Sequence, residues 1–443
     1  MLPRAGKIDI ENITVPQLDE IAGAHELTVV AAGRADLANL FERDTARSVY
    51  DKAQRNLTMI ITTGGKMGFA GVPFLPVKFN FFAPFGEAFY VPYFHKDHGP
   101  TWNMLVEAKP GSPLDRFGDC KSGEQAVAVY KQVIKEMIPW DYDWARNMEL
   151  ADPHGWLVGR VAPTVRKPVG RLPSGPIVTP LGDTAMALDP IGGQGANNGN
   201  KMARNLVESM IARKDLAFDA QWMTDTFERF YNRFGGVTYT FNNILLEPIT
   251  NAGKMLLIAQ YGSDGSARGS TGQQRIADTF IENFNDAKVL TSAFLDIHKA
   301  QAVIREKTGR SWPIAVARGA LGVAKGQLRQ KLGRDPRHPT SPDRTLDPFP
   351  EPGRTTSGQT RSSNDLQHDL CFPSDSDQIA YVGLCVRGAF SEEDKPSTAT
   401  YVSAPSSVFA SRRSRISNPS GDHPPTRASS RAFAATCPRH VPA

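Results

Sequence analysis

A short apolar run near the start of the chain constrains the fold more than any other segment. Leu27–Ala32 reads LTVVAA and ends at Gly33. A run without polar alternation predicts a strand that is buried on both faces, as the strands of a parallel sheet are. Because one strand makes no sheet, its partners must come either from later in this chain or from residues that this chain lacks. The segment Gly175–Leu181 (GPIVTPL) is the second strand candidate.

The segment from about Asn56 to Pro110 has a different pattern. Its short runs are dense in Phe, Tyr and Val and are separated by Gly and Pro: Leu57–Thr63, Phe74–Phe82 and Ala88–Phe94. Such runs predict an antiparallel sheet. Their rings fit the wall of an apolar pocket, and they fit a plain aromatic core as well. With two kinds of sheet, the chain is expected to have an α/β (α+β) fold.

Capping residues and apolar spacing predict several helices. Ser122 with Gln125 resembles a capping box, and Pro139 ends the helix that follows. Asp219 is expected to cap another helix, which places four rings toward a core: Trp222, Phe227, Phe230 and Phe234. Helical spacing continues through Asp278–Arg305.

The C-terminal part of the chain differs in composition. Residues 334–443 are rich in Pro, Ser, Thr and Arg, which predicts a disordered tail. A natural linker and a frameshifted reading would both look like this. Its basic SRRSR run and a formal net charge of +5 make only a weak case for nucleic-acid binding, so none is expected.

Membrane, secretory and metal classes receive no support from the sequence. There is no secretory signal and no apolar run of roughly 20 residues for a membrane span. The four cysteines include no CxxC pair, so neither a zinc site nor a disulfide framework is expected. A cytoplasmic location is the expectation for such a chain.

The segment Leu181–Gly199 carries the chemistry. It reads LGDTAMALDPIGGQGANNG, follows a predicted strand and leads into a predicted helix. Its glycines allow a ligand to approach the backbone closely, and the helix start near Ala196 offers free N–H groups and a positive dipole end. Asp183, at the strand end, can accept hydrogen bonds from sugar-type hydroxyls. The alternative is a Gly-rich loop that caps a helix for packing alone.

This segment resembles the GD…DP…GQGxN segment of the FAD-dependent aromatic hydroxylase fold. By that resemblance, Gly182 and Asp183 hold the ribityl chain of FAD. The resemblance also predicts a set of residues that line the flavin: Asp189, Pro190, Ile191, Gly192, Gly193, Gln194, Gly195, Ala196 and Asn197. Asn198 adds a second amide at the start of the helix.

A second matching piece is Thr28–Arg34 (TVVAAGR), which in the hydroxylases ends beside the cofactor; Gly33 and Arg34 are therefore expected there. Single-component hydroxylases carry an Asp-Gly pair at this point, whereas Ala35 and Asp36 follow here. In this the chain resembles the styrene monooxygenase branch, whose members receive reduced FAD from a separate flavin reductase. Other stretches resemble that branch too: FYVPYF, IPWDY, APTVRKPVGRLPSG and FDAQWMTDTFERFY. The resemblance runs from about Lys7 to about Arg310.

The resemblance implies an FAD-dependent monooxygenase or epoxidase. Reduced FAD and O₂ would form a C4a-hydroperoxide, and one oxygen atom would pass to a small apolar, aromatic or alkene-type substrate. The cofactor carries this chemistry, so no acid–base dyad is expected and the catalytic side chains are unknown. A homodimer fits such an enzyme, but the sequence leaves the assembly open.

One family feature has no counterpart in this sequence. No GxGxxG loop, which would hold the ADP half of FAD, follows any strand candidate. We therefore expect an N-terminally truncated member with five parts: a residual FAD-binding part (1–55), a substrate-binding domain (56–165), an FAD-binding segment (166–255), a helical region (256–333) and the tail (334–443). The alternative is a non-catalytic remnant with a ligand-binding or interaction role.

Three smaller groups of residues are open to a functional interpretation. His95, Asp97 and His98 could form a metal site, but a solvated turn is the favoured interpretation, and no metal is expected. Trp140 and Trp144 do not form the WxWxIP pattern of flavin-dependent halogenases. Cys120 and His154 are expected to be structural.

Overall fold

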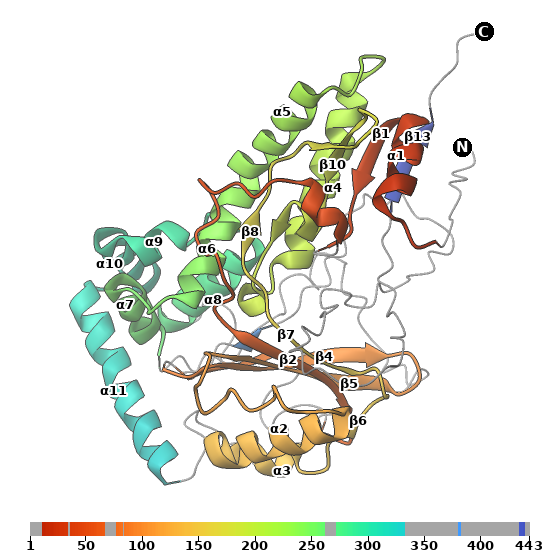
Figure 1. The fold of residues 1–443 in the computed structure, drawn as a ribbon. Helices are drawn as coiled ribbons and strands as arrows, with labels where there is room; N and C mark the ends of the chain where they lie inside the picture. The colour runs from red at the N-terminus through yellow and green to blue at the C-terminus, as the bar shows by residue number, and fades with distance from the viewer. Residues whose placement is uncertain are drawn as a thin grey trace, which may run out of the picture. The chain divides into compact units, whose positions relative to one another are not determined.

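The computed structural model describes residues 11–33, 36–66, 77–82, 84–261 and 272–332, together with two short strands, Ala380–Tyr381 and Ala434–Pro438. Figure 1 shows the elements in chain order. The chain divides into two compact units. Unit 1 comprises Met1–Ala53, Val161–Asn242 and Val402–Ala443, and unit 2 comprises Gln54–Arg160 and Asn243–Tyr401. The five-part division expected from the sequence stays a prediction, and most of 334–443 lies outside the described residues.

Unit 1 is built on a four-stranded sheet with the order β13-β1-β10-β9. β1 (His25–Val30) and β10 (Ile177–Pro180) run parallel, with Val29 opposite Thr179. β9 (Gly170–Arg171) and β13 (Ala434–Pro438) pair with them in the antiparallel sense. Both predicted strands are therefore present, and the first has the parallel neighbour that its apolar run predicted.

β1 is buried on both faces, as the apolar run predicted. Val30 packs in one cluster with Leu18 of α1 (Val15–Gly23). Leu27, on the opposite face, packs in another with Leu206 and Trp222. Each face of the strand is thus covered by helix, which requires apolar residues at consecutive positions.

Three helical segments follow the glycine-rich loop of unit 1. α4 spans Gly195–Arg213, α5 spans Ala220–Phe230, and α6 spans Gly236–Leu246 after a π-helical turn at Tyr231–Gly235. The predicted cap of α5 is confirmed, because the Asp219 carboxylate accepts a 2.8 Å hydrogen bond from the backbone N–H of Trp222. Short elements complete the unit: η1 (Asp36–Leu40), β8 (Thr164–Val165), η3 (Gly182–Thr184), β11 (Met186–Ala187) and η4 (Pro190–Gly192).

Unit 2 contains a seven-stranded antiparallel sheet with the order β12-β3-β4-β5-β2-β6, in which β7 also pairs with β2. The strands are β2 (Asn56–Thr63), β3 (Val77–Phe82), β4 (Gly86–His95), β5 (Gly99–Ala108), β6 (Glu149–Leu150), β7 (Trp156–Gly159) and β12 (Ala380–Tyr381). The predicted antiparallel sheet is confirmed. β5, its central strand, was not predicted, and residues 74–76 of the second predicted run lie outside the described residues.

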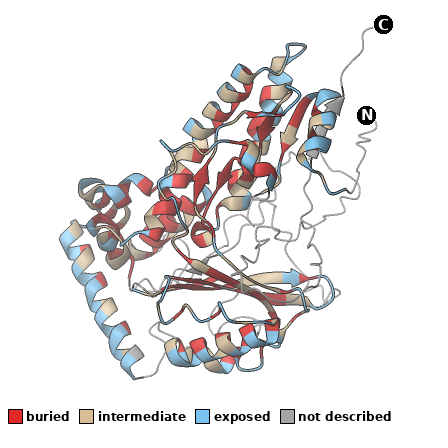
Figure 2. Cartoon of the chain, viewed as in Figure 1, coloured by how far each residue is buried: buried red, intermediate tan, exposed pale blue. Residues whose placement is uncertain are grey.

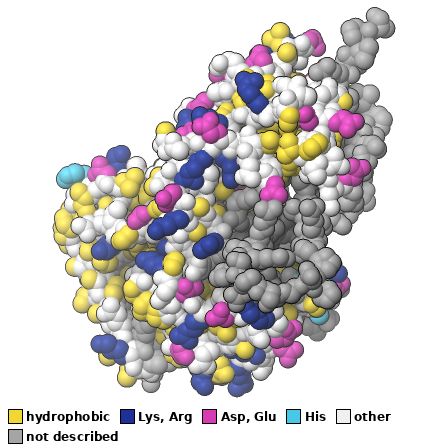
Figure 3. All heavy atoms as spheres, viewed as in Figure 1, with side chains coloured by type: hydrophobic (Ala, Val, Ile, Leu, Met, Phe, Trp, Pro, Cys, Tyr) yellow, Lys and Arg dark blue, Asp and Glu magenta, His cyan; other side chains and the backbone are white. Residues whose placement is uncertain are grey.

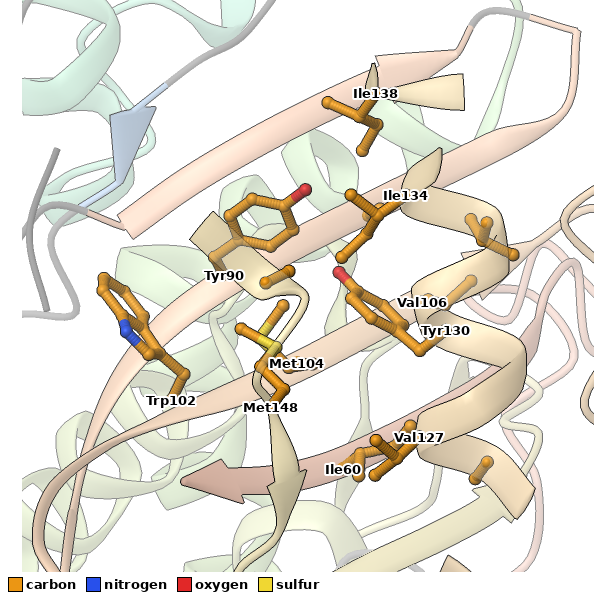
Figure 4. Close-up of a cluster of buried hydrophobic side chains, with 14 of the residues drawn as sticks. Ile60, Tyr90, Trp102, Met104, Val106, Val127, Tyr130, Ile134, Ile138 and Met148 are labelled. Atoms are coloured by element: carbon orange, nitrogen blue, oxygen red, sulfur yellow. The ribbon is translucent and has the colours of Figure 1, made fainter. Parts of the chain in front are cut away.

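One face of this sheet packs on α2 (Gly123–Met137). Figure 4 shows Tyr130 and Ile134 of α2 directed toward Tyr90 and Met104 of the sheet. The Ser122 cap is confirmed, because its hydroxyl accepts from the Gln125 N–H at 3.3 Å. η2 (Pro139–Asp141) and α3 (Tyr142–Ala145) follow, and Trp144 of α3 stacks on Tyr90 with 4.7 Å between ring centroids.

In the helical region of unit 2, the described residues form five helices: α7 (Asn251–Gln260), α8 (Gly272–Asn285), α9 (Thr291–Leu295), α10 (Ile297–Thr308) and α11 (Trp312–Lys331). The helical spacing over 278–305 is divided among α8, α9 and α10. Asp296 ends the middle helix and caps the next, because its carboxylate accepts from the N–H groups of His298 and Lys299. The α/β (α+β) prediction is confirmed. Within the described ranges, no helix is both long and apolar enough to cross a membrane.

Candidate functional site

Two turns meet at the carboxyl ends of the parallel strands β1 and β10. β1 leads to Gly33 (φ 62°), and β10 leads to Gly182 (φ 61°) and η3. Both φ values lie in the left-handed region that favours glycine. The Thr184 hydroxyl donates a 3.1 Å hydrogen bond to the Gly33 carbonyl, which joins the two turns. Parallel pairing thus brings the predicted residues Gly33 and Asp183 to one edge of the sheet.

The N-terminus of α4 lies against the same edge. A Cβ placed on Gly195 would be 3.8 Å from Oδ1 of Asp183, and one on Gly199 would be 3.7 Å from Cα of Gly182. The N-cap residue, Gln194, makes no side-chain cap to the helix. Its amide instead donates to the Gly192 carbonyl at 2.9 Å. The positive end of a 19-residue helix therefore lies beside the Asp183 carboxylate.

The loop between β11 and α4 is shaped by its own side chains. Asp189 Oδ1 accepts from the Ile191 N–H at 3.2 Å, and the Gly193 N–H donates to the Pro190 carbonyl at 2.7 Å. Gly193 takes a left-handed φ of 58°. An Asp cap, a Pro at the first turn position and a Gly at the left-handed position are the residue types that this turn requires.

The predicted site residues differ in accessibility. Gly193 and Ala196 are exposed. Six are half-buried: Gly33, Gly182, Asp183, Pro190, Gly195 and Asn197. Five are buried: Asp189, Ile191, Gly192, Gln194 and Asn198. Arg34 lies outside the described residues.

Two buried asparagines at this loop have amide atoms without a partner. Asn198, in the first turn of α4, is 2% exposed; its Nδ2 lies 3.9 Å from Met186 Sδ, and its Oδ1 accepts no hydrogen bond. Asn242 of α6 is fully buried, and neither its Oδ1 nor its Nδ2 has a partner. A Cβ on Gly192 would come within 2.5 Å of Asn242 Oδ1. Buried polar atoms are normally paired, so these atoms fit a site that takes a polar ligand or ordered water.

Sequence reasoning did not identify Asn242 or Arg166. The Arg166 guanidinium donates to the carbonyls of Asp183 and Thr184 at 3.2 and 3.1 Å, and so holds the turn that presents the Asp183 carboxylate. Neither residue belongs to the glycine-rich motif, and no local spacing distinguishes them. Only the fold brings them to it.

The sheet of unit 2 has a second face, opposite α2, which we call the aromatic face. Cross-strand register places Phe79 opposite Phe89, Phe89 opposite Leu105, and Val91 opposite Asn103. Met59 and Ile61 of β2 continue the face beyond β5. The ring centroids of Phe79 and Phe89 are 4.2 Å apart. Several residues of the face are half-buried: Met59, Ile61, Val91, Tyr93, Asn103 and Leu105.

Asn103 is a polar position within the apolar part of the aromatic face. Val91 lies opposite it on β4 and Ile61 opposite it on β2. Its Oδ1 is buried and accepts no hydrogen bond. A ligand N–H or O–H that reached this face would find a hydrogen-bond acceptor at Asn103.

The candidate metal cluster is engaged in structural contacts. His95 Nε2 lies 2.9 Å from Asp152 Oδ2, and His98 Nε2 lies 2.9 Å from the Ala151 carbonyl. The His95 hydrogen bond lowers the pKa of the Asp152 carboxyl. The turn is not wholly solvated, because His95 is only 5% exposed. In the part of the chain that the structure describes, no three His, Cys, Asp or Glu residues form a group that could hold a metal.

Comparison with known proteins identifies the relatives of this chain. Residues 33–144, which include β2 to β5 and α2, match the family described as "Styrene monooxygenase A putative substrate binding domain". Over this region and beyond it, the chain is similar to the styrene monooxygenases. Styrene monooxygenase StyA of Pseudomonas fluorescens is 24% identical over 294 residues, and StyA of a Pseudomonas species is 23% identical over 296 residues. Each match covers 64% of this chain and 66% of the relative, so the resemblance expected from the sequence is confirmed over that length.

Solved structures give weaker matches. The flavin-dependent brominase Bmp2 aligns with a TM-score of 0.32 at 14% identity, over 68% of this chain and 63% of its own. The p-nitrophenol 4-monooxygenase PnpA of Pseudomonas putida DLL-E4 aligns with a TM-score of 0.32 at 17% identity, over 59% and 56%.

Proposed function

We propose that this chain is the oxygenase component of a two-component, FAD-dependent monooxygenase. The observation that carries the proposal is the meeting of Gly33, Asp183 and the α4 N-terminus at the carboxyl edge of β1 and β10. In α/β sheets, ligands bind at this edge. The unpartnered Oδ1 of Asn198, in the first turn of the same helix, adds a buried acceptor that a polar cofactor can satisfy.

Each element of the site has a role toward the flavin. The Asp183 carboxylate would accept hydrogen bonds from the ribityl hydroxyls, and Arg166 keeps its turn in place. The exposed backbone at Gly193 and Ala196 allows close approach of a planar ring. The positive end of α4 would stabilise negative charge on the reduced ring. Bound reduced flavin would supply the activation of O₂, and the protein would orient the ring and exclude water.

The substrate would be a small apolar aromatic or alkene-type molecule that binds to the aromatic face. Met59, Val91 and Leu105 are half-buried apolar residues of this face, in the region that matches the substrate-binding family. Burial of apolar area would provide most of the affinity. Asn103 would orient those substrates that carry a hydrogen-bond donor.

The partner would be a separate flavin reductase that supplies reduced FAD. Gly33 is followed by Arg34, Ala35 and Asp36, where single-component hydroxylases carry an Asp-Gly pair that serves NAD(P)H. A chain without that pair would depend on flavin that has been reduced elsewhere.

FAD titration of the full chain tests the cofactor site. Flavin fluorescence and absorbance would be followed for the unsubstituted protein, for Asp183→Ala, and for Asp225→Ala, an exposed carboxylate on α5 that serves as the matched control. Loss of hydrogen bonds to a charged group costs about 1.5–3 kcal/mol, so Asp183→Ala should weaken binding roughly 10- to 150-fold. Asp225→Ala should leave it unchanged.

Two results would contradict the proposal. The first is a folded chain that binds no FAD. The second is an equal loss of affinity in both variants. In the first case the aromatic face alone would remain to be tested, as the ligand-binding surface of a protein without turnover.

A further inference from the structure

Helix α11 carries an exposed apolar seam on unit 2. Five residues form it at alternating spacings of three and four: Ile314, Ala317, Leu321, Ala324 and Leu328. All five are exposed, and the three large ones are 53%, 69% and 62% exposed. We call this row the α11 seam. Figure 2 shows α11 as a largely exposed helix, and Figure 3 shows hydrophobic side chains gathered on that side of the molecule.

The opposite face of α11 is the one that anchors it. Ala315, Gly319 and Gly326 are buried on that face. A Cβ on Gly319 would lie 1.8 Å from the carbonyl oxygen of Ile258 on α7, so the two helices approach at their backbones. The small residues thus determine how α11 packs on its own unit, and the seam is left on the outside.

The seam is flanked by positive charge. No Asp or Glu occurs between Glu306 and Asp335. Arg318, Lys325 and Arg329 follow one another at spacings of seven and four, so they line one side of the seam. A surface of this kind attracts acidic groups.

The spacing and the side-chain sizes favour a helix as the occupant. Alternation of three and four is the repeat by which two helices interlock, and the alanines between large residues leave holes for a partner's side chains. A lipid surface favours a broader apolar face, usually with Trp or Phe, and this seam has no aromatic residue. A second copy of α11 is a poor occupant, because its cations would be repelled by the cations of a helix that has no acidic residue.

We propose that the α11 seam docks an amphipathic helix of another protein, with acidic residues beside that helix's own apolar row. The large seam residues would fill the partner's holes, and Arg318 and Lys325 would face its carboxylates. The α11 seam does not include any residue of the flavin site, so this proposal does not depend on whether the chain binds FAD.

Peptide binding to the full chain tests this. Two fluorescently labelled helical peptides of three heptads would share a seam of alternating Leu and Ala, one with Glu and one with Gln beside it. Anisotropy should show the Glu peptide binding about tenfold more tightly. Leu321→Gln with Leu328→Gln should weaken its binding at least tenfold. Ala320→Gln, an exposed change off the seam, should not.

Charge reversal adds a readout that a folding defect cannot imitate. Arg318→Glu with Lys325→Glu should lose the Glu peptide and gain a peptide flanked by Lys. Thermal unfolding should be unchanged in every variant, because the substituted side chains are exposed. Four results would overturn the proposal: equal binding of the two peptides, binding of neither, a concentration-dependent dimer that Leu321→Gln abolishes, or co-sedimentation with phosphatidylserine vesicles that Leu321→Gln abolishes.

Discussion

Two Arg–Glu pairs in this protein are both bidentate but differ in burial. In unit 2, Arg55 donates from Nε and one terminal nitrogen to Glu87 at 2.8 and 3.1 Å. In unit 1, Arg47 donates to both carboxylate oxygens of Glu228 at 2.7 and 2.8 Å. The side chains of the first pair are 3% and 0% exposed, and those of the second are 26% and 34% exposed. The chain therefore offers a matched comparison of a buried and a partly exposed ion pair.

We expect Arg55→Met to destabilise unit 2 strongly. Met keeps the length of the side chain but leaves the Glu87 carboxylate without its guanidinium. Glu107 lies directly opposite Glu87 on β5, and both side chains are 0% exposed. Without the guanidinium, the Glu87 carboxylate would therefore be repelled by the neighbouring carboxylate and would not be solvated by water. Breaking a buried pair by removing one partner costs about 3–5 kcal/mol. The same change at Arg47 should cost about 1 kcal/mol, because that pair is partly solvated.

Urea unfolding at neutral pH measures both effects when Trp fluorescence and far-UV circular dichroism are followed together. Trp222 is in unit 1 and the remaining five Trp residues are in unit 2, so the fluorescence reports mainly on the Arg55 variants. The circular dichroism signal records the helices of both units and therefore also reports on Arg47→Met. The double variant Arg55→Met with Glu87→Gln should recover part of the loss, because it removes the buried negative charge at position 87. Equal, small losses for Arg55→Met and Arg47→Met would refute the reasoning, and so would a double variant less stable than Arg55→Met alone.

Three further outcomes are expected. Gly192→Ala should lower both the melting temperature and the FAD affinity, because the new Cβ would lie 2.5 Å from Asn242 Oδ1. Adding Asn242→Ala should restore the melting temperature. A double variant that melts no higher than Gly192→Ala would exclude this clash as the cause. The His95 hydrogen bond lowers the pKa of Asp152, so its stabilising effect is present above the ordinary pKa of 3.8 and is lost as pH falls through the lower folded value. Acid titration of Asp152→Asn against the unsubstituted protein should therefore show a stability difference that shrinks below about pH 4, and a difference that grows there would contradict it. Burial raises the pKa of the Cys120 thiol above its ordinary 9.0, so peptide mapping after alkylation across pH should give a midpoint above that value.

Backbone-determined features were predicted well from the sequence. The run Leu27–Ala32 indicated a doubly buried strand, and Asp219 and Ser122 cap the helices that they were expected to cap. These features depend on the spacing of apolar residues along the chain and on hydrogen bonds between residues that are a few positions apart in the sequence. β5 was not singled out, although its sequence alternates: Trp102, Met104 and Val106 lie on the face toward α2, and Asn103 and Glu107 lie on the other face. Its pairing with β4 and β2, on either side, makes it a strand.

For the candidate site, the sequence predicted the local turn but not the residues that reach it from distant segments. The glycine-rich segment showed its turn chemistry directly, since Asp189, Pro190 and Gly193 are the residue types for that turn. The roles of Arg166 and Asn242 were not predictable, because each reaches the loop from a distant part of the chain. Both residues act through tertiary contacts with the loop, and a local sequence pattern does not predict such contacts.

The sequence by itself determined the type of most main elements, the turn beside the α4 N-terminus and the resemblance to the styrene monooxygenases. Tertiary structure decided which charged and polar groups became buried and which apolar groups stayed outside. Glu87 alternates along β4 as a solvent-facing residue would, yet it is fully buried with Arg55, while Leu321 of α11 is 69% exposed. The physical reason is that the free energy of a side chain depends on the neighbours that packing supplies, and those neighbours come from segments far apart in the chain.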